Sequence, residues 1–186
     1  MNEMPDRRCP RALLAFVLLA LPATALAAGA QPFKLNSPAY KSGETIPARF
    51  TCTGAGISPP LAWSGAPKGT KSFAFILKDP DAPDPRAPKM TWTHWVLYDI
   101  SAEVHKLAAG ESRHLPPGTR VGENSWKRND YGGPCPPIGR HHYVHVLYAL
   151  DTVLPNLHHP DARALEAAMH GHILARATLI ATYKKP

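Results

Sequence analysis

Short apolar runs of strand length recur along the chain, and turn-forming residues separate them. Several are rich in Val, Ile, Tyr, Phe and Trp and have Pro and Gly at their ends, which is typical of antiparallel strands. We expect strands at residues 46–51, 61–64, 72–78, 91–100, 142–151 and 178–183. This spacing predicts a mainly β fold, an antiparallel β-sandwich or barrel with a few short peripheral helices.

One segment has the pattern of a helix. Asp161 suits an N-cap, Leu165 and Met169 recur on one helical face, and Gly171 suits a stop. A weaker helical pattern covers residues 102–109. Residues 110–137 form a long polar connection whose second half is rich in Pro and Gly, and loops of this length in a compact domain are usually functional or mobile.

The first 27 residues read as a secretory signal peptide. Arg7, Arg8 and Arg11 precede a short apolar run at 12–21, and small residues follow up to Ala27. The apolar run is shorter than the ~20 residues that a membrane span needs. We therefore expect cleavage near Ala27, one domain at 28–186, and a periplasmic or secreted location. Cleavage after Ala30 and export by a twin-arginine route remain alternatives.

Two cysteines, Cys52 and Cys135, follow the predicted cleavage site. In an oxidising compartment such a pair commonly forms a disulfide, which we take as a hypothesis beside the alternative of two buried thiols. No Cys-x-x-Cys occurs, so a structural zinc ribbon is excluded.

Composition narrows the class of protein. The 186 residues are 44% apolar and 19% charged, which excludes a disordered chain, and the 21 prolines argue against a helical bundle. The net charge is +7, and no block of like charge occurs in the sequence. A diffuse positive charge of this kind favours anionic ligands but indicates nothing more specific about the function. No recognition helix and no basic amphipathic helix is visible, so we expect no nucleic-acid partner and at most peripheral membrane contact.

Common catalytic motifs are absent. The segment Gly65 to Ser72 nearly matches a phosphate-binding loop, but Thr70 replaces the glycine before the lysine and a strand follows. Neither His-Glu-x-x-His nor Gly-x-Ser-x-Gly occurs. We therefore expect no catalytic residue, no metal site and no cofactor.

Polar and aromatic side chains gather where three of the expected strands begin or end. Alternation along 91–100 places Trp92 and His94 on the face of Val96 and Tyr98. Alternation along 142–151, extended to 141, places His141, Tyr143 and His145 together. If these strands are neighbours with matching ends, four side chains converge at one rim: Asp79, His94, His141 and Tyr143.

Such a group of side chains is suited to an anion. Imidazoles and a phenol donate hydrogen bonds, while the carboxylate fixes the tautomer of an imidazole or raises its pKa. The alternative is that these residues are ordinary surface or hydrogen-bonded histidines, since the chain holds ten.

The sequence also resembles the phosphatidylethanolamine-binding protein family, in particular its bacterial Raf-kinase-inhibitor-like branch. The resemblance covers about residues 33–183 and rests on ordered motifs: Phe50-Thr51-Cys52, Ser58-Pro59-Pro60-Leu61-Ala62-Trp63, Asp79-Pro80-Asp81-Ala82-Pro83, Thr93-His94-Trp95-Val96-Leu97-Tyr98, and Tyr131-Gly132-Gly133-Pro134-Cys135-Pro136-Pro137 ahead of His141-His142-Tyr143.

This resemblance implies an antiparallel β-sandwich with a small pocket for phosphate or a phosphorylated head group. Its ligand-binding side chains would be Asp79, His94, His141 and Tyr143, with walls formed by Pro83, Trp92 and Gly133. Many eukaryotic members have Arg where this chain has His142, which by alternation faces away from the ligand.

The sequence thus predicts a non-enzymatic binding or regulatory protein with a pocket for a small anion. One alternative is a periplasmic inhibitor of a protease or another target enzyme, which the family resemblance permits. Another is a metal-assisted phosphoester hydrolase that uses Asp79, His94 and His141.

Overall fold

The structure, a computed structural model, describes Met1 and residues 31–186. In that part of the chain the elements are β1 (Lys34–Asn36), η1 (Ala48–Phe50), β2 (Leu61–Ser64), β3 (Ser72–Asp79), β4 (Trp92–Ser101), β5 (Lys106–Leu107), η2 (Glu111–Arg113), β6 (Arg120–Val121), β7 (Arg140–Leu150), α1 (Ala162–Ala168) and β8 (Ile173–Lys184). The expected signal peptide lies almost wholly outside the described residues. No helix within 31–186 has the length and apolar character needed to cross a membrane.

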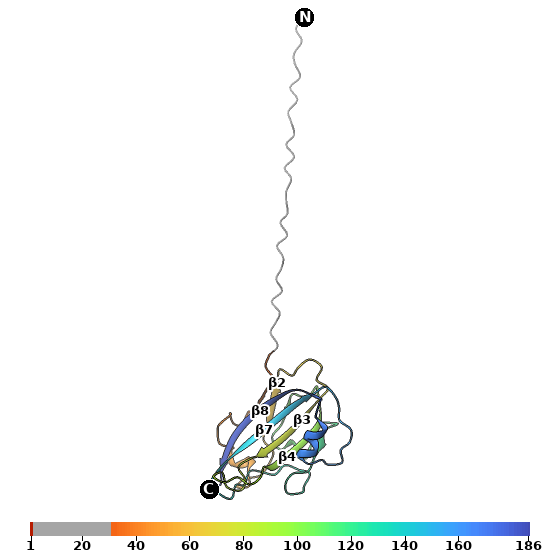
Figure 1. Ribbon diagram of the computed structural model, residues 1–186. Helices are drawn as coiled ribbons and strands as arrows, with labels where there is room; N and C mark the ends of the chain where they lie inside the picture. Colours follow the sequence, from red (N-terminus) through yellow and green to blue (C-terminus); the bar gives the residue numbers. More distant parts are fainter. Residues whose placement is uncertain (2–30) are drawn as a thin grey trace.

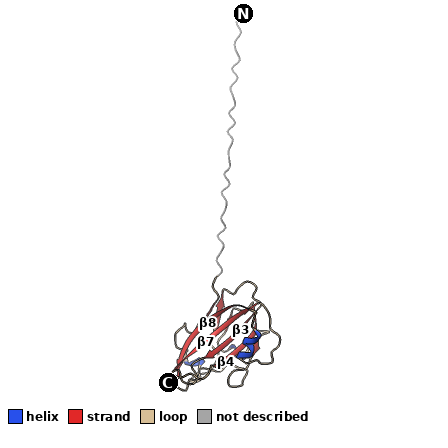
Figure 2. Ribbon diagram, in the orientation of Figure 1, coloured by secondary structure: helices blue, strands red, loops and turns tan. Residues whose placement is uncertain are grey.

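The strands form two antiparallel sheets (Figures 1 and 2). The smaller sheet has the order β1-β2-β5, and the larger has the order β6-β4-β3-β7-β8. The long strands β3, β4, β7 and β8 run side by side in the larger sheet, and helix α1 lies against it. The predicted mainly β, antiparallel two-sheet architecture is confirmed.

Apolar side chains cover the larger sheet on both faces. On one face Phe73, Phe75 and Leu147 pack toward Leu35 and Trp63 of the smaller sheet. On the other face another set of buried side chains meets α1: Ile76, Val96, Tyr98, Val146, Leu165 and Met169. Burial on both faces explains why β3 and the second half of β7 are nearly continuous apolar runs rather than alternating ones.

Helix α1 begins and ends near the predicted signals. The carboxylate of Asp161 accepts a hydrogen bond from the backbone N–H of Ala164 at 2.8 Å, which caps the first turn. The helix ends at Ala168, and Gly171 follows with a φ of 83°. Leu165 and Met169 are fully buried, so the apolar face anchors this short helix to the sheet.

Two element predictions are wrong. Residues 46–51 form no regular strand, because Pro47 has no N–H for a sheet ladder and the backbone turns into η1, where the Thr51 hydroxyl donates to the carbonyl of Ala48. Residues 102–109 form no helix. Leu107 instead pairs with Leu61 across β5 and β2, and its buried side chain joins the core.

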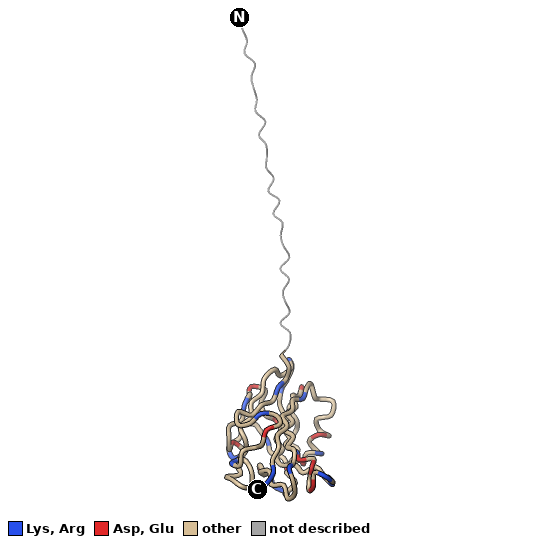
Figure 3. Tube along the Cα trace, turned by 90° about the vertical axis from the view of Figure 1, so that its left-hand side faces the viewer, with Lys and Arg blue, Asp and Glu red and all other residues tan. Residues whose placement is uncertain are grey.

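Charged residues of both signs are interspersed along the whole described chain (Figure 3). The net positive charge therefore forms no single basic face, as the even distribution in the sequence indicates.

Candidate functional site

One end of the larger sheet carries a cavity of about 360 Å³. It lies where β3 ends and where β4 and β7 begin, and two loops, 80–91 and 122–139, close it. Its lining consists of Asp79, Ala82, Pro83, Met90, Trp92, His94, Trp126, Cys135, Pro136, Pro137 and His141. Three of the four side chains that the sequence predicts at one rim therefore line a single cavity. The fourth, Tyr143, is not among the lining residues, but its ring packs edge-on against His94 with 5.2 Å between the ring centroids.

His94 reaches the cavity because β4 is irregular at this position. Alternation predicts His94 on the face of Val96 and Tyr98, and that prediction is wrong. Val96 and Tyr98 pack on the outer face of the sheet with the residues of α1. The ring of His94 instead meets Tyr143, which belongs to the core between the two sheets.

The pairing of β4 with β3 identifies the cause. The residue pairs on the two sides of the irregularity are Leu77 with Trp95 and Lys78 with Thr93. His94 is thus an extra residue in β4, as in a β-bulge, and a bulge turns one residue of a strand out of the simple alternation. An unbroken strand would place His94 opposite Lys78, on the other side of the sheet.

Asp79 and His141 form a buried pair. His141 Nδ1 lies 2.7 Å from Asp79 Oδ2, and His141 Nε2 lies 3.0 Å from the carbonyl oxygen of Ile138. The other carboxylate oxygen of Asp79 accepts the backbone N–H of Asp81 at 2.9 Å. Burial raises the pKa of Asp79, although the hydrogen bond to His141 works against that rise.

Hydrogen-bond counting fixes the charge of this pair. The carbonyl of Ile138 only accepts, so His141 Nε2 carries a proton. The contact between Nδ1 and the carboxylate holds one further proton, on nitrogen in an ion pair or on oxygen in a neutral pair. The pair of Asp79 and His141 is electrically neutral in both cases, so it does not repel an anion.

Gly132 orients His94. The backbone N–H of Gly132 donates to the carbonyl of His94 at 2.9 Å, and His94 Nδ1–H donates to the carbonyl of Gly132 at 2.7 Å. The ring is buried, and burial lowers the pKa of His94 to about 4. His94 is therefore neutral near pH 7, with its proton on Nδ1 and a lone pair on Nε2.

Three buried polar atoms lack a hydrogen-bond partner among the described residues; two belong to the cavity lining and one to Tyr143, which packs against His94. They are His94 Nε2, Tyr143 Oη and Trp92 Nε1, and they make up half of the six such side-chain atoms in that part of the chain. Burial, and next the nearby Asp79 carboxylate, raise the pKa of Tyr143 well above its ordinary value, so its hydroxyl keeps its proton. Because an unpaired buried polar group costs about 1–3 kcal/mol, such a cluster indicates a place for a polar ligand.

Much of the cavity wall is apolar. Pro83 lines it as predicted, together with Pro136 and Pro137. Sequence reasoning missed Trp126, whose ring stands edge-on to Trp92 and His94 at centroid distances of 5.3 and 5.1 Å. A lone tryptophan in an otherwise polar segment was the available signal.

The two neighbouring glycines have different roles. A Cβ on Gly132 would lie 2.2 Å from the Trp126 ring, so only glycine admits that tryptophan. Gly133 was expected in the cavity wall, but it is not among the lining residues. A Cβ on Gly133 would lie 3.1 Å from the backbone of Thr51, so this glycine allows the loop to pack closely on that segment.

A disulfide joins Cys52 to Cys135, with 5.4 Å between their Cα atoms. Cys135 lines the cavity, and the backbone N–H of Cys52 donates to the carbonyl of Pro134 at 3.1 Å. The hydroxyl of Tyr131 also donates to the carbonyl of Phe50 at 2.6 Å. These contacts hold the proline-rich wall against the segment around η1.

The cavity lining holds no lysine or arginine. His142 is exposed and does not line it. Its ring lies 2.7 Å from Asp81 Oδ2, so it faces away from the cavity, as alternation predicts. Neutral N–H and O–H groups are therefore the donors available to an anion here.

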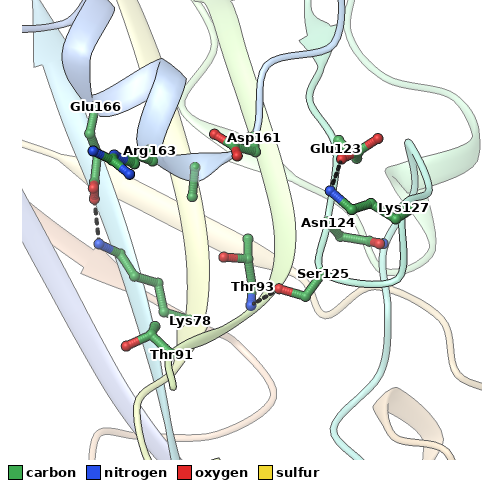
Figure 4. A pocket seen from close by; sticks show the side chains of 11 residues that line it. Lys78, Thr91, Thr93, Glu123, Asn124, Ser125, Lys127, Asp161, Arg163 and Glu166 are labelled. Atoms are coloured by element: carbon green, nitrogen blue, oxygen red, sulfur yellow. Dashed lines mark hydrogen bonds and ion pairs between the residues drawn. The ribbon is translucent and has the colours of Figure 1, made fainter. Parts of the chain in front are cut away.

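A second cavity, of about 390 Å³, lies near β4 and the start of α1 (Figure 4). Its charged side chains largely neutralise one another: Lys78 pairs with Glu166, and Lys127 pairs with Glu123. Asp161 is occupied as the cap of α1. None of the unpartnered buried polar atoms of the described chain belongs to its lining, so we place the candidate site in the first cavity.

The donor set does not suit a metal ion. Within residues 31–186 no three His, Cys, Asp or Glu side chains are arranged to hold one. Asp79 and His141 contact each other, and both ring nitrogens of His141 are engaged.

Comparison with known proteins gives the family. Residues 36–184 match the family model described as phosphatidylethanolamine-binding protein. The chain therefore belongs to the phosphatidylethanolamine-binding protein family, as its motifs predict.

Several relatives are similar over nearly their whole length. A UPF0098 protein of Methanothermobacter thermautotrophicus is 41% identical over 153 residues, which cover 81% of this chain and 98% of the relative. The crystal structure of CT736 from Chlamydia trachomatis, a homologue of phosphatidylethanolamine-binding protein, is 38% identical with a TM-score of 0.76, covering 83% of this chain and 98% of that one. YbcL of E. coli is 31% identical with a TM-score of 0.75, covering 83% and 99%.

Proposed function

We propose that this protein is a non-enzymatic binding or regulatory protein whose cavity takes a small oxyanion, such as phosphate or the phosphate of a head group. The observation that carries the proposal is that two lining residues of one cavity, His94 and Trp92, hold buried polar atoms without a partner among residues 31–186. Tyr143, which holds a third such atom, packs against His94. The hydroxyl of Tyr143 and the N–H of Trp92 are neutral donors of the kind that oxyanion oxygens accept from, and the neutral pair of Asp79 and His141 does not repel the charge of an anion.

The chemistry of the lining supports binding rather than turnover. The lining contains no serine, threonine or lysine, and its one cysteine is held in a disulfide, so no ordinary nucleophile faces the cavity. The signal-peptide pattern of residues 1–27 supports the further proposal that the protein acts in the periplasm or outside the cell.

Calorimetric titration with inorganic phosphate tests this proposal. We expect wild-type protein to bind phosphate and Tyr143→Phe to bind it about tenfold more weakly, because the variant loses a single donor to a charged group. Tyr148→Phe is the matched control, since Tyr148 packs on the outer face of the sheet. Equal phosphate affinity in wild type and Tyr143→Phe would remove this site from consideration.

A second candidate role is inhibition of a protease or another enzyme. It is supported by apolar side chains exposed close to the cavity, with Met90 50%, Ile138 49% and Trp126 38% exposed. Only this role predicts a stoichiometric complex with a target enzyme that Met90→Ser and Ile138→Ser weaken while phosphate affinity stays unchanged.

A further inference from the structure

We propose that the outer edge of β8, at residues 175–179, is a docking site for an extended acidic peptide segment, which pairs with this edge as an added strand. Two hollows flank the edge, and no residue that lines either of them also lines the cavity with His94. The inference therefore goes beyond the anion site and does not depend on it.

Strand β8 is an edge strand, with β7 on one side only (Figure 1). An extended segment of this chain already pairs with part of its outer edge. The N–H of Thr182 donates to the carbonyl of Glu44, and the carbonyl of Thr182 accepts from the N–H of Ile46, both at 2.8 Å. The backbone groups of Thr182 therefore point away from β7, and this edge accepts a strand-like partner.

The neighbouring stretch of the edge has no such cover among the described residues. The register with β7 is unbroken across residues 175–184, so alternation gives Arg176 and Thr178 the same backbone orientation as Thr182. Arg176 and Thr178 are exposed, and no group within residues 31–186 hydrogen-bonds to their backbone N–H or C=O. Two donors and two acceptors therefore lie along this edge at the spacing of a strand.

A groove of about 320 Å³ lies beside this stretch, between β8 and the segment that contains β1. Thr178 and Leu179 form one side of the groove, and residues from the segment 33–42 form the other. Lys34 and Lys41 both line it, whereas no aspartate or glutamate does. An added strand would therefore set some of its side chains beside two lysines.

The opposite face of the same stretch is basic as well. A hollow of about 380 Å³ on that face is lined by Arg176 and Thr178, together with residues of β3 and β7, and again no acidic residue lines it. Side chains of a strand alternate between the two faces of a sheet. A partner strand at this edge would therefore meet basic side chains on both faces.

The carboxylates that contact these linings are already engaged. Glu44 accepts the backbone N–H of Lys41 at 2.7 Å, and Glu166 pairs with Lys78. Lys34 and Arg176 form no ion pair with any residue of the described part of the chain. The positive charge at the edge is therefore available to a partner.

Charge and backbone geometry together favour one kind of partner. A second copy of this chain would bring its own Arg176 and lysines to the edge, and like charges opposite one another destabilise a strand pair. Lipids and nucleic acids are anionic but lack the alternating N–H and C=O groups that an edge strand pairs with. An extended segment rich in aspartate or glutamate supplies both the charge and the backbone groups.

Fluorescence anisotropy with three short labelled peptides tests the inference on the unaltered protein. The first peptide alternates glutamate with threonine, the second alternates lysine with threonine, and the third is the acidic peptide methylated on its backbone nitrogens. We expect the acidic peptide to bind and the other two to bind at least about tenfold more weakly, because one has the wrong charge and the other has lost its donors.

Two variants at one position isolate the backbone contact. Thr178→Pro removes an N–H that points away from β7, which an edge strand tolerates, and it should weaken binding of the acidic peptide about three- to tenfold. Thr178→Ala is the matched control, because it keeps the N–H and removes only the side-chain hydroxyl, and it should bind as the wild type does.

A second pair of variants tests the charge. Replacing Lys34 and Lys41 together with glutamate should weaken binding of the acidic peptide at least about tenfold, since two attractive charges become repulsive. Lys106→Glu is the control, because Lys106 is an exposed lysine on β5, at the other edge of the smaller sheet. Circular dichroism verifies that each variant is folded.

Three results would overturn the inference: no binding of the acidic peptide, equal binding of the acidic and basic peptides, or unchanged binding after backbone methylation. A dimer in analytical ultracentrifugation that Thr178→Pro dissociates would assign the edge to a second copy and overturn it too. The peptide comparison needs no variant, so it decides the matter even where Thr178→Pro does not fold. Phosphate affinity should be the same in wild type and Thr178→Ala, which keeps this test separate from that of the anion site.

Discussion

Burial and the few polar groups around each ring set the chemistry of two buried histidines, His94 and His145. His94 and His145 have the same side chain and a similarly buried position, and burial lowers the pKa of each to about 4. The tyrosine hydroxyl of Tyr40 donates to His145 Nε2 at 2.9 Å, whereas His94 Nε2 has no such partner among the described residues. The ring of His145 is therefore fully hydrogen-bonded within the core, whereas His94 lines the cavity and keeps one nitrogen without a partner among the described residues.

The lowered pKa values of His94 and His145 predict that the folded protein loses stability in acid. A folded-state pKa of about 4 lies below the unfolded value of about 6.5, so the stability that each neutral ring contributes is present above pH 6.5 and is lost as the pH falls toward 4. At pH 5 we expect each ring to have removed about 2 kcal/mol from the free energy of unfolding. The raised pKa of Asp79 acts in the opposite sense.

Urea unfolding of the protein at pH 7, 6 and 5 measures this loss. His172→Gln serves as a control variant, because an exposed histidine should leave the slope unchanged. A free energy of unfolding that stays constant from pH 7 to pH 5 would contradict the prediction.

At the scale of elements, the site depends on features that interrupt regular structure. The bulge in β4 turns His94 into the cavity, and the Gly132-Gly133 pair lets one loop pack on both Trp126 and Thr51. The strand periods and the helix cap of α1 were predictable because they follow local rules. The bulge was not predictable, because it depends on which strand lies alongside. The turn into η1 was missed although Pro47 gave a local signal against a strand.

The disulfide predicts a coupled loss of stability and binding. Replacing Cys52 and Cys135 with serine removes a cross-link between positions 83 residues apart, which gives the unfolded chain more conformational freedom. We therefore expect the free energy of unfolding to fall by about 2–4 kcal/mol. Because Cys135 also lines the cavity, phosphate affinity should fall in the same variant. Denaturant unfolding and calorimetry measure the two effects.

A variant that only loses stability provides the comparison for that experiment. Leu165→Ala removes a buried side chain of α1 on the opposite face of the sheet and should lower stability by about 2–5 kcal/mol without changing phosphate affinity. Unchanged phosphate affinity in the serine variant would show that the wall keeps its position without the disulfide.

At the scale of the whole molecule, the larger sheet is a layer between two apolar cores. Its edges and ends carry the polar chemistry, and the charges are dispersed over the surface (Figure 3). The cavity lies at one end of this layer and is lined without lysine or arginine. The site thus differs from an anion site that depends on a basic patch.

This arrangement predicts weak salt dependence. With neutral donors as the direct contacts, phosphate affinity should change by less than about threefold between roughly 50 and 300 mM sodium chloride, since screening acts mainly on exposed charges. Calorimetric titrations at the two salt concentrations measure it. A drop of tenfold or more would indicate that lysine or arginine side chains outside the lining hold the anion.

The sequence by itself determined the antiparallel β class, the main strands, the capped helix and the family, because these follow from local periodicity, turn chemistry and ordered motifs. It also indicated Asp79, His94, His141 and Tyr143. Only the tertiary structure decided which way His94 points, that Gly133 supports the loop rather than the cavity, and that Trp126 forms a wall. Those outcomes depend on strand register and on contacts between distant segments, and no local pattern of residues encodes either one.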